Sequence, residues 1–157
     1  YLIESSQLYI SLMDKLKIAE FIVFFDFEIE VCQIIEAKSS SPQPGNIENF
    51  DSFINDICEK FINSFNLLLA NRFKRHRNDN HEEMPVKFQS FNFTSTGFKF
   101  VLIINNHQTE WLPPLNDSLK IKLNPFVKAF NIPHSNIKVL NDKLARENGY
   151  LKNSTIG

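Results

Sequence analysis

The longest helical pattern of the chain runs from Ile47 to His76. Apolar side chains recur in it every three, four or five residues, which is close to the period of an α-helix, at Ile47, Phe50, Ile54, Ile57, Phe61, Phe65, Leu68 and Phe73. Four more apolar residues make this stripe wider than a two-stranded coiled-coil seam, namely Phe53, Cys58, Ile62 and Leu69. The pattern predicts an amphipathic helix that covers one face of a sheet.

The strongest strand pattern lies between Glu20 and Lys38. Apolar residues alternate there with acidic ones, and continuous apolar runs flank the alternation, as expected where a strand is covered on both faces. Nineteen residues are too many for one straight strand. The segment therefore either bends or forms a hairpin with a tight turn near Asp26.

Two further amphipathic helices are predicted near the ends of the chain. The first follows a cap at Ser5 or Ser6 and has an apolar face made by Leu8, Leu12, Met13 and Leu16. The last begins at Ser135 or Asn136 and ends near Asn148, where Gly149 provides a stop signal.

The segments between the long helix and the last helix are predicted from β-rich and proline-rich stretches. Val86 to Thr94 and Phe98 to Asn105 have the pattern of a hairpin. Adjacent prolines at 113 and 114 predict an extended loop or edge segment over His107 to Ser118. Leu119 to Leu123 fits a short strand or a helical turn, and Phe126 to Phe130 fits a short helix.

Together these elements predict a single α+β domain over residues 1–157. Its small, mostly antiparallel sheet packs against one long amphipathic helix, with short helices at the N- and C-terminal ends. The 16 phenylalanines among 157 residues predict a large aromatic core. Because the chain begins with Tyr1, we expect it to be a fragment of a longer protein.

Charge and cysteine content narrow the possible functions. The formal net charge of −1 argues against a dedicated nucleic-acid or membrane-surface binder, because no basic excess is available to bind phosphates. No apolar run reaches the ~18 residues of a membrane span. Cys32 and Cys58 lie in apolar segments and are expected to be buried free thiols, which suits a reducing compartment.

Most common catalytic motifs are absent from the sequence. The glycines are isolated, so there is no phosphate-binding loop and no dinucleotide fingerprint. The histidines lie in polar segments without metal-ligand spacing, and no serine lies in a nucleophile elbow. We therefore expect no cofactor and no metal site in the leading hypothesis, which is a non-enzymatic protein.

One pattern indicates a different chemistry. Asp26 is followed after nine residues by Glu36-Ala37-Lys38, which resembles the D…ExK arrangement of the PD-(D/E)xK nucleases. In those enzymes two carboxylates hold Mg²⁺ and the lysine orients water, and the aspartate and the ExK triplet lie on neighbouring strands. The other interpretation is that Asp26 belongs to a solvated strand face and that Glu36 and Lys38 mark the end of the strand.

A basic run, Arg72 to Arg77, follows the long helix. It fits a helix C-terminus, where the macrodipole favours cations. The other interpretation is a nuclear-localisation or phosphate-binding patch.

Two other segments resemble the sedlin-type longin-fold small subunits of the TRAPP vesicle-tethering complex. They are Gly97-Phe98-Lys99-Phe100-Val101-Leu102-Ile103 and Leu123-Asn124-Pro125-Phe126. The resemblance implies a longin-like fold and a role in vesicle tethering or trafficking as a subunit of a complex.

The leading hypothesis is a protein–protein interaction or scaffold subunit of a larger complex. Its expected partners are other protein subunits, without a small-molecule cofactor, and nucleic acid is not expected among them. The binding residues would be Leu8, Leu12, Leu16, Trp111, Leu112 and Phe126. The alternatives are a Mg²⁺-dependent PD-(D/E)xK-type nuclease and a scaffold domain of a kinetochore or other nuclear assembly. The expected location is intracellular, either cytoplasmic or nuclear.

Overall fold

The computed structural model describes residues 2, 9, 16–26, 30–75 and 85–151. Its elements are, in chain order, β1 (Phe21–Asp26), β2 (Glu30–Lys38), α2 (Ile47–Arg72), α3 (Val86–Ser90), β3 (Gly97–Ile104), the 3-10 helix η2 (Thr109–Trp111), α4 (Leu112–Ala129), the 3-10 helix η3 (His134–Asn136), β4 (Ile137–Asn141) and α5 (Asp142–Glu147). The predicted α+β class is confirmed.

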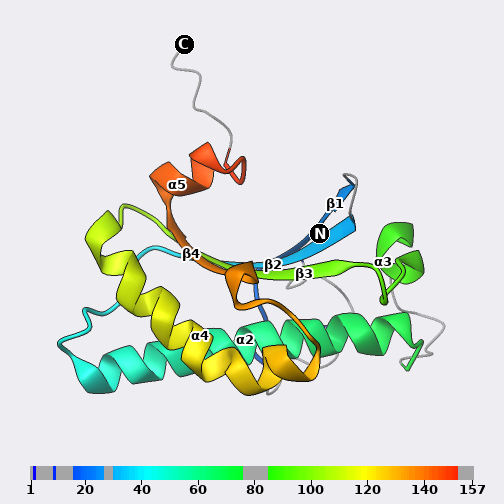
Figure 1. Ribbon diagram of the computed structural model, residues 1–157, viewed down its shortest axis with the longest axis horizontal. Coiled ribbons are helices and arrows are strands. Elements are labelled where there is room, and N and C mark those ends of the chain that lie inside the picture. The colour runs from blue at the N-terminus through cyan, green and yellow to red at the C-terminus, as the bar shows by residue number, and fades with distance from the viewer. Residues whose placement is uncertain (1, 3–8, 10–15, 27–29, 76–84, 152–157) are drawn as a thin grey trace, which may run out of the picture.

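The four strands form one sheet in the order β1-β2-β3-β4 (Figure 1). β1 and β2 are antiparallel, which confirms the hairpin interpretation of Glu20 to Lys38. β3 is parallel to both β2 and β4, so the sheet is mixed and the prediction of a mostly antiparallel sheet is wrong. Parallel neighbours need a long crossover connection, and α2 and α4 supply the two crossovers.

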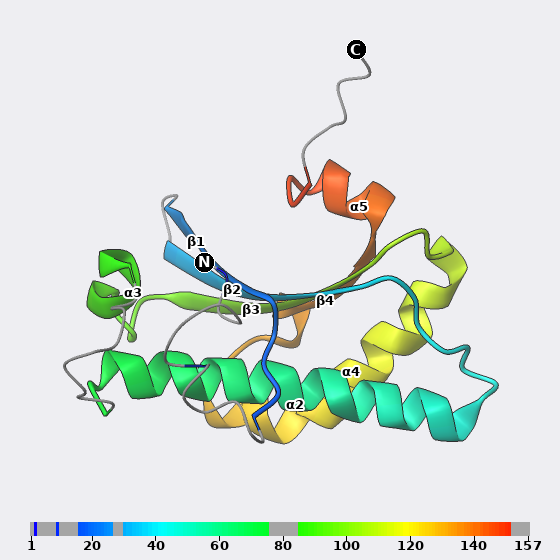
Figure 2. The same ribbon diagram turned by 180° about the vertical axis from the view of Figure 1, so that it is seen from behind.

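The predicted central helix is confirmed as α2, which ends at Arg72 rather than at His76. The side chain of Asn46 caps it by accepting a hydrogen bond from the backbone N–H of Asn49 at 3.4 Å. α2 and α4 cover the same face of the sheet (Figure 2). The apolar stripe of α2 therefore packs on the sheet, as the sequence predicts.

The predicted hairpin of Val86 to Thr94 with Phe98 to Asn105 is wrong. Its first half contains the short helix α3, and its second half is β3, which pairs with β2 and β4. The aromatic residues that suggested a strand, Phe88 and Phe91, are buried core residues. Their hydrophobicity reflects packing against the core rather than cross-strand pairing.

The predicted loop around the two prolines is also wrong. Pro113 and Pro114 occupy the first turn of α4, where a missing backbone N–H leaves no helical hydrogen bond unmade. The separate elements predicted at Leu119 to Leu123 and Phe126 to Phe130 are parts of this one helix, which ends at Ala129 and contains Pro125.

The predicted last helix is half correct. Its first part is strand β4, in which buried Ile137 and Val139 alternate with the half-buried Lys138. Its second part is α5, whose cap is Asn141, with the side chain accepting from the N–H of Leu144 at 2.9 Å. α5 packs with Ile35, Val101, Ile103 and Leu140 on the sheet face opposite to α2.

Phe65 lies at the centre of the aromatic core and has no exposed surface. Its ring lies 4.7 to 6.3 Å, between centroids, from the rings of Phe93, Phe98, Phe100, Phe126 and Phe130. These rings come from α2, β3, α4 and the segments before β3 and after α4. The core therefore holds the crossover helices α2 and α4 onto the sheet at β3.

Candidate functional site

The structure separates the three residues of the predicted nuclease pattern. Asp26 is at the hairpin end of β1, where it pairs with Glu30. Glu36 is six residues further along β2, a distance of roughly 20 Å at the rise of a β-strand. Glu36 and Lys38 therefore lie close together at one end of the hairpin, and Asp26 lies at the other end.

Glu36 is a fully buried carboxylate held between two lysines. Its Oε1 atom lies 2.9 Å from Nζ of Lys38 and 2.6 Å from Nζ of Lys60. Lys38 ends β2, whereas Lys60 comes from the middle of α2. We refer to Glu36, Lys38 and Lys60 as the carboxylate–lysine cluster, which joins the sheet to the helix that covers it.

The second carboxylate oxygen of Glu36, Oε2, is buried and has no hydrogen-bond partner. Leaving a buried polar atom unpaired costs about 1–3 kcal/mol, and more if the group is charged. Such atoms are rare in folded proteins and are commonly explained by an ion, a water molecule or a functional role. Oε2 is therefore the atom in the described part of the chain that most needs a ligand.

Two opposing effects act on the pKa of Lys60. Burial lowers it, but the hydrogen bond and the negative charge of Glu36 outweigh burial, so the pKa of Lys60 is raised above its ordinary value. The ammonium group therefore stays charged at neutral pH. It can therefore neutralise the carboxylate of Glu36.

A second carboxylate is brought toward this cluster by the hairpin register. The last pair of the register is Phe21 with Ile35, and Glu20 is the bend residue just before β1, so extending the register by one position would put it opposite Glu36. Residues that face each other across antiparallel strands have their side chains on the same side of the sheet. Glu20, which is half-buried, is therefore placed on the α2 side, as Glu36 is.

The segment that precedes β1 is fastened to α2 next to Lys60. The backbone N–H of Ala19 donates to Oγ of Ser64 at 2.8 Å, and Ser64 Oγ in turn donates to the carbonyl oxygen of Lys60 at 2.8 Å. The Asn63 side chain donates to the carbonyl oxygen of Lys17 at 2.9 Å. These bonds hold the segment just before Glu20 against the same stretch of helix that supplies Lys60.

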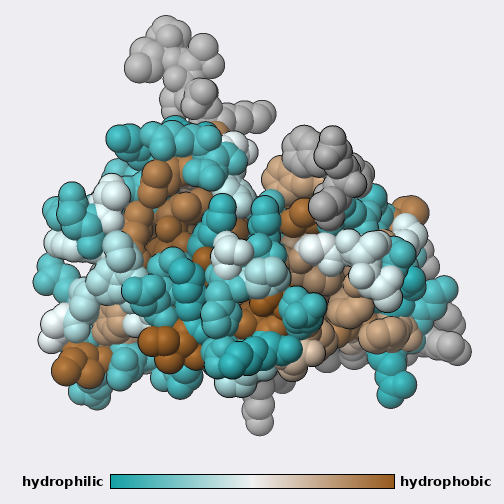
Figure 3. Space-filling view, viewed as in Figure 1, coloured by the Kyte–Doolittle hydropathy of each residue, from teal (hydrophilic) through white to brown (hydrophobic). Residues whose placement is uncertain are grey.

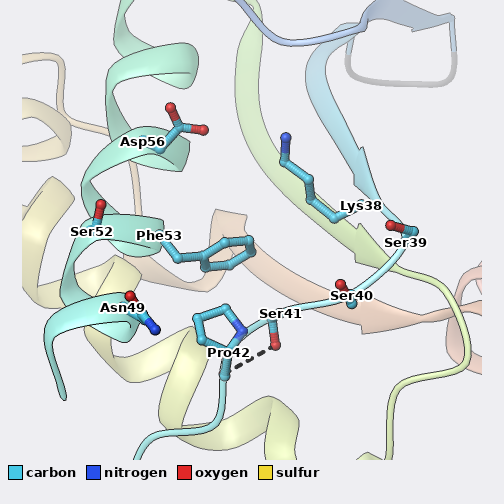
Figure 4. Close-up of a pocket in the computed structure, with 9 residues that line it drawn as sticks. All are labelled: Lys38, Ser39, Ser40, Ser41, Pro42, Asn49, Ser52, Phe53 and Asp56. Atoms are coloured by element: carbon cyan, nitrogen blue, oxygen red, sulfur yellow. Dashed lines mark hydrogen bonds between the residues drawn. The ribbon is translucent and has the colours of Figure 1, made fainter. Parts of the chain in front are cut away.

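An open pocket of about 680 Å³ lies beside the cluster, between the end of β2 and the first turns of α2 (Figure 4). The Lys38 side chain extends along one wall, opposite Asp56 of α2, and the Phe53 ring projects between the walls. The lining residues are Lys38, Ser39, Ser40, Ser41, Pro42, Asn49, Ser52, Phe53 and Asp56. Lys38 thus belongs both to the pocket and to the carboxylate–lysine cluster.

The residues predicted for a protein-binding surface are placed in different environments. Leu8 and Leu12 lie outside the described residues. Leu16 and Phe126 are half-buried and pack against the main core, and Leu112 is buried. Trp111 is half-buried, with its ring 5.4 Å from the His107 ring between centroids.

Other reactive side chains of the described chain are used structurally. Cys32 and Cys58 are buried free thiols, as predicted. Burial raises the pKa of both, that of Cys58 to about 12, so neither is a nucleophile at neutral pH.

Arg72 donates through Nε to the carbonyl oxygen of Phe91 at 3.3 Å, so it helps to fix the end of α2. Within the described ranges, no three His, Cys, Asp or Glu side chains form a metal-binding group.

Sequence reasoning missed Glu20 and Lys60. For Lys60 there was a helical signal, because it precedes the buried Ser64 by one turn and therefore borders the apolar stripe. For Glu20 the signal was the hairpin itself, since antiparallel pairing of β1 with β2 brings the start of β1 beside the end of β2.

The described chain is therefore an α+β protein with a buried carboxylate–lysine cluster beside an open polar pocket. Comparison with protein-family models, with curated proteins and with solved structures gives no match to this chain. Among the described helices, none combines the length and the hydrophobicity that crossing a membrane requires.

Proposed function

We propose that this protein is a metal-dependent phosphodiester hydrolase that acts on nucleic acid, in the manner of the PD-(D/E)xK nucleases. The observation that carries the proposal is the unpaired, buried Oε2 of Glu36 in a Glu-x-Lys triplet. In this proposal the second carboxylate is that of Glu20, which just precedes the strand paired with β2, and not that of Asp26.

The residues present fit Mg²⁺. This ion prefers oxygen ligands and is usually held by one or two carboxylates, with waters and substrate phosphates completing its shell. Oε2 of Glu36 is one free carboxylate oxygen, and Glu20, one position beyond the last pair of the register, would supply the second carboxylate. In the described structure the two lysines neutralise Glu36, as a cation would.

Each residue of the cluster has a role that follows from its charge. A bound Mg²⁺ would supply a Lewis acid for the scissile phosphate and lower the pKa of an attacking water. Glu36 and Glu20 would hold the cation through carboxylate oxygens. Lys38, the more exposed of the two lysines, would donate to the attacking water or to a phosphate oxygen. Lys60 would stay against Glu36 and balance the charge that develops on phosphate.

The net charge of −1 agrees with this role only if nucleic acid is bound locally. A long basic surface would be needed for tight, non-specific binding through many phosphates. A site made of two lysines and a divalent cation, by contrast, has to bind only one phosphate. The proposal therefore predicts weak overall affinity and chemistry confined to the cluster.

The test is cleavage of end-labelled single-stranded and double-stranded DNA by the purified protein in Mg²⁺ or Mn²⁺. The expected result is product in either metal and none in EDTA. Absence of cleavage of both DNA forms and of RNA in both metals would refute the proposed function.

The hairpin register makes a separate prediction about the second carboxylate. Glu20→Gln is expected to lower cleavage about tenfold or more, because one of two ligands to the cation is lost. Asp26→Asn is the matched control and should leave cleavage unchanged, because Asp26 lies at the far end of the hairpin. Equal losses in the two variants, measured as initial rates, would contradict the assignment of Glu20.

A subunit of a protein complex, including a sedlin-like trafficking subunit or a nuclear scaffold, remains the second candidate. Its support is a set of exposed apolar side chains that a partner would cover, among them Ile47, Val86 and Ile121. Apolar residues gather in separate areas on the face drawn in Figure 3, with polar residues between them. Affinity purification with mass spectrometry tests this candidate, and recovery of the bait alone would count against it.

A further inference from the structure

We propose that the open pocket beside the carboxylate–lysine cluster binds one unpaired nucleotide, so that the protein prefers single-stranded nucleic acid to a duplex. This inference rests on the proposed function and names its substrate class. It starts from the fact that the pocket and the cluster share Lys38. A nucleotide held in the pocket would have a neighbouring phosphate within reach of that lysine.

The pocket has the size and the lining that a nucleotide requires. Its volume of about 680 Å³ lies within the range of small-molecule sites, ~300–1,000 Å³. Phe53 is half-buried and packs in part against the main core, and its ring projects into the space between the β2 end and α2 (Figure 4). An aromatic face of this kind stacks an unpaired base of any sequence.

Polar groups around the ring fit a sugar and a phosphate. The three serines Ser39 to Ser41 supply hydroxyl groups on one wall, and Asn49 and Ser52 supply an amide and a hydroxyl on the other. These groups both donate and accept hydrogen bonds. They can therefore bind ribose or deoxyribose oxygens and phosphate oxygens without a fixed sequence preference.

The carboxylate of Asp56 also lines the pocket, and it shares one lysine with Glu59. Nζ of Lys17 lies 2.9 Å from Oδ1 of Asp56 and 3.3 Å from a carboxylate oxygen of Glu59. Lys38 adds a positive charge on the facing wall. Lys17 and Lys38 therefore reduce the electrostatic repulsion between Asp56 and a bound phosphate.

The serine wall of the pocket is supported by the segment that follows β3. Oγ of Ser41 lies 3.3 Å from Nε2 of His107, in the segment that follows β3. The carbonyl oxygen of His107 accepts from the Asn141 side chain at 3.0 Å, and the Trp111 ring packs edge-on against the imidazole. Burial lowers the pKa of His107 below its ordinary value, so the neutral ring is favoured at neutral pH. The Ser41 end of the wall is thus held by contacts within the protein.

Single-strand preference follows from the geometry. The Phe53 ring projects from α2 toward the end of β2, and a base that stacks face to face on it no longer stacks on its neighbours in a duplex. Unpairing and unstacking a base in a duplex costs free energy that a single strand does not spend.

The experiment measures binding by fluorescence anisotropy, in EDTA and at one fixed salt concentration, so that no cleavage occurs. The probes are fluorescein-labelled 12-nucleotide oligo(dT), 12-nucleotide oligo(U) and a 12-base-pair DNA duplex. The variant is Phe53→Leu, which keeps an apolar side chain but removes the stacking ring. The matched control is Phe73→Leu, at an exposed aromatic position on the end of α2.

The expected result is tighter binding of one or both single strands than of the duplex, by about tenfold or more. The two single-stranded probes show whether deoxyribose or ribose is preferred. Phe53→Leu should weaken single-strand binding about five- to a hundredfold, the range of a lost stacking contact, while Phe73→Leu binds like the wild type. Thermal melting of each variant confirms that it is folded.

Equal affinity for single strand and duplex, no binding at all, or unchanged binding by a folded Phe53→Leu would overturn the inference. If Phe53→Leu is not folded, Ser52→Ala together with Asn49→Ala takes its place, with the same expected direction. Because binding is measured without metal, its failure is distinct from failure of cleavage. Single-strand binding without cleavage would retain the pocket and reject the hydrolase.

Discussion

Replacing Glu36 with glutamine is expected to lower metal-dependent DNA cleavage by roughly 10²–10³-fold, the effect of losing several kcal/mol of metal-based catalysis. Glutamine keeps the size of the side chain but removes the charge of Oε2, the buried oxygen that has no partner in the protein. Initial rates of cleavage in Mg²⁺ and in Mn²⁺ measure the effect.

Glu30→Gln is the matched control for this experiment. Glu30 lies on the same strand and the same side of the sheet as Glu36, and it also contacts a lysine, Lys87, and the hydroxyl of Thr96. It differs in lying six residues away, at the hairpin end of β2. Its substitution should leave cleavage near the wild-type rate. A comparable loss in both variants would mean that activity depends on the stability of β2 and not on the carboxylate of Glu36.

The second large effect concerns the fold. Phe65→Ala is expected to lower the free energy of unfolding by about 3–5 kcal/mol, because it removes a fully buried ring and leaves a cavity among five others. For a chain of this length the melting temperature falls ~2–4 °C per kcal/mol. A drop of roughly 6–20 °C is therefore expected by thermal circular dichroism.

Phe73→Ala provides the comparison, since Phe73 follows the same helix but its side chain is 65% exposed. Its substitution should change the free energy of unfolding by no more than about 0.5 kcal/mol. If the two variants melted at the same temperature, Phe65 would not be the centre of the core that holds α2 and α4 on the sheet.

Elements defined by a long local pattern could be predicted from the sequence. The stripe of α2 recurs over seven turns of helix, and packing on the sheet agrees with it throughout. The hairpin of β1 and β2 was one of two predicted outcomes for a strand pattern too long to be straight.

Elements whose local signals conflict with their tertiary surroundings could not be predicted. Pro113 and Pro114 ordinarily interrupt a helix, but at its first turn they are compatible with one, and only the position of α4 shows this. Phe88 and Phe91 have β propensity, which burial against the core overrides. The partner of β3 could not be read from its own apolar run, since it pairs with two strands distant in sequence.

The candidate site was predictable only where its residues are close in sequence. Glu36 and Lys38 are neighbours along one strand face, so the triplet Glu-x-Lys places them together from sequence alone. Lys60 reaches them from a helix that begins nine residues after the strand ends, and Glu20 reaches them through the register of a hairpin. Both contacts require the tertiary arrangement.

The most direct test of the central claim, that Glu36 is part of a divalent-metal site, is anomalous diffraction from crystals of the protein soaked in Mn²⁺. The expected result is an anomalous peak at ligand distance from Oε2 of Glu36, on the side that faces Glu20, and its loss in crystals of Glu36→Gln. A peak elsewhere on the protein, or none at Glu36 in well-diffracting crystals that carry Mn²⁺, would contradict the claim.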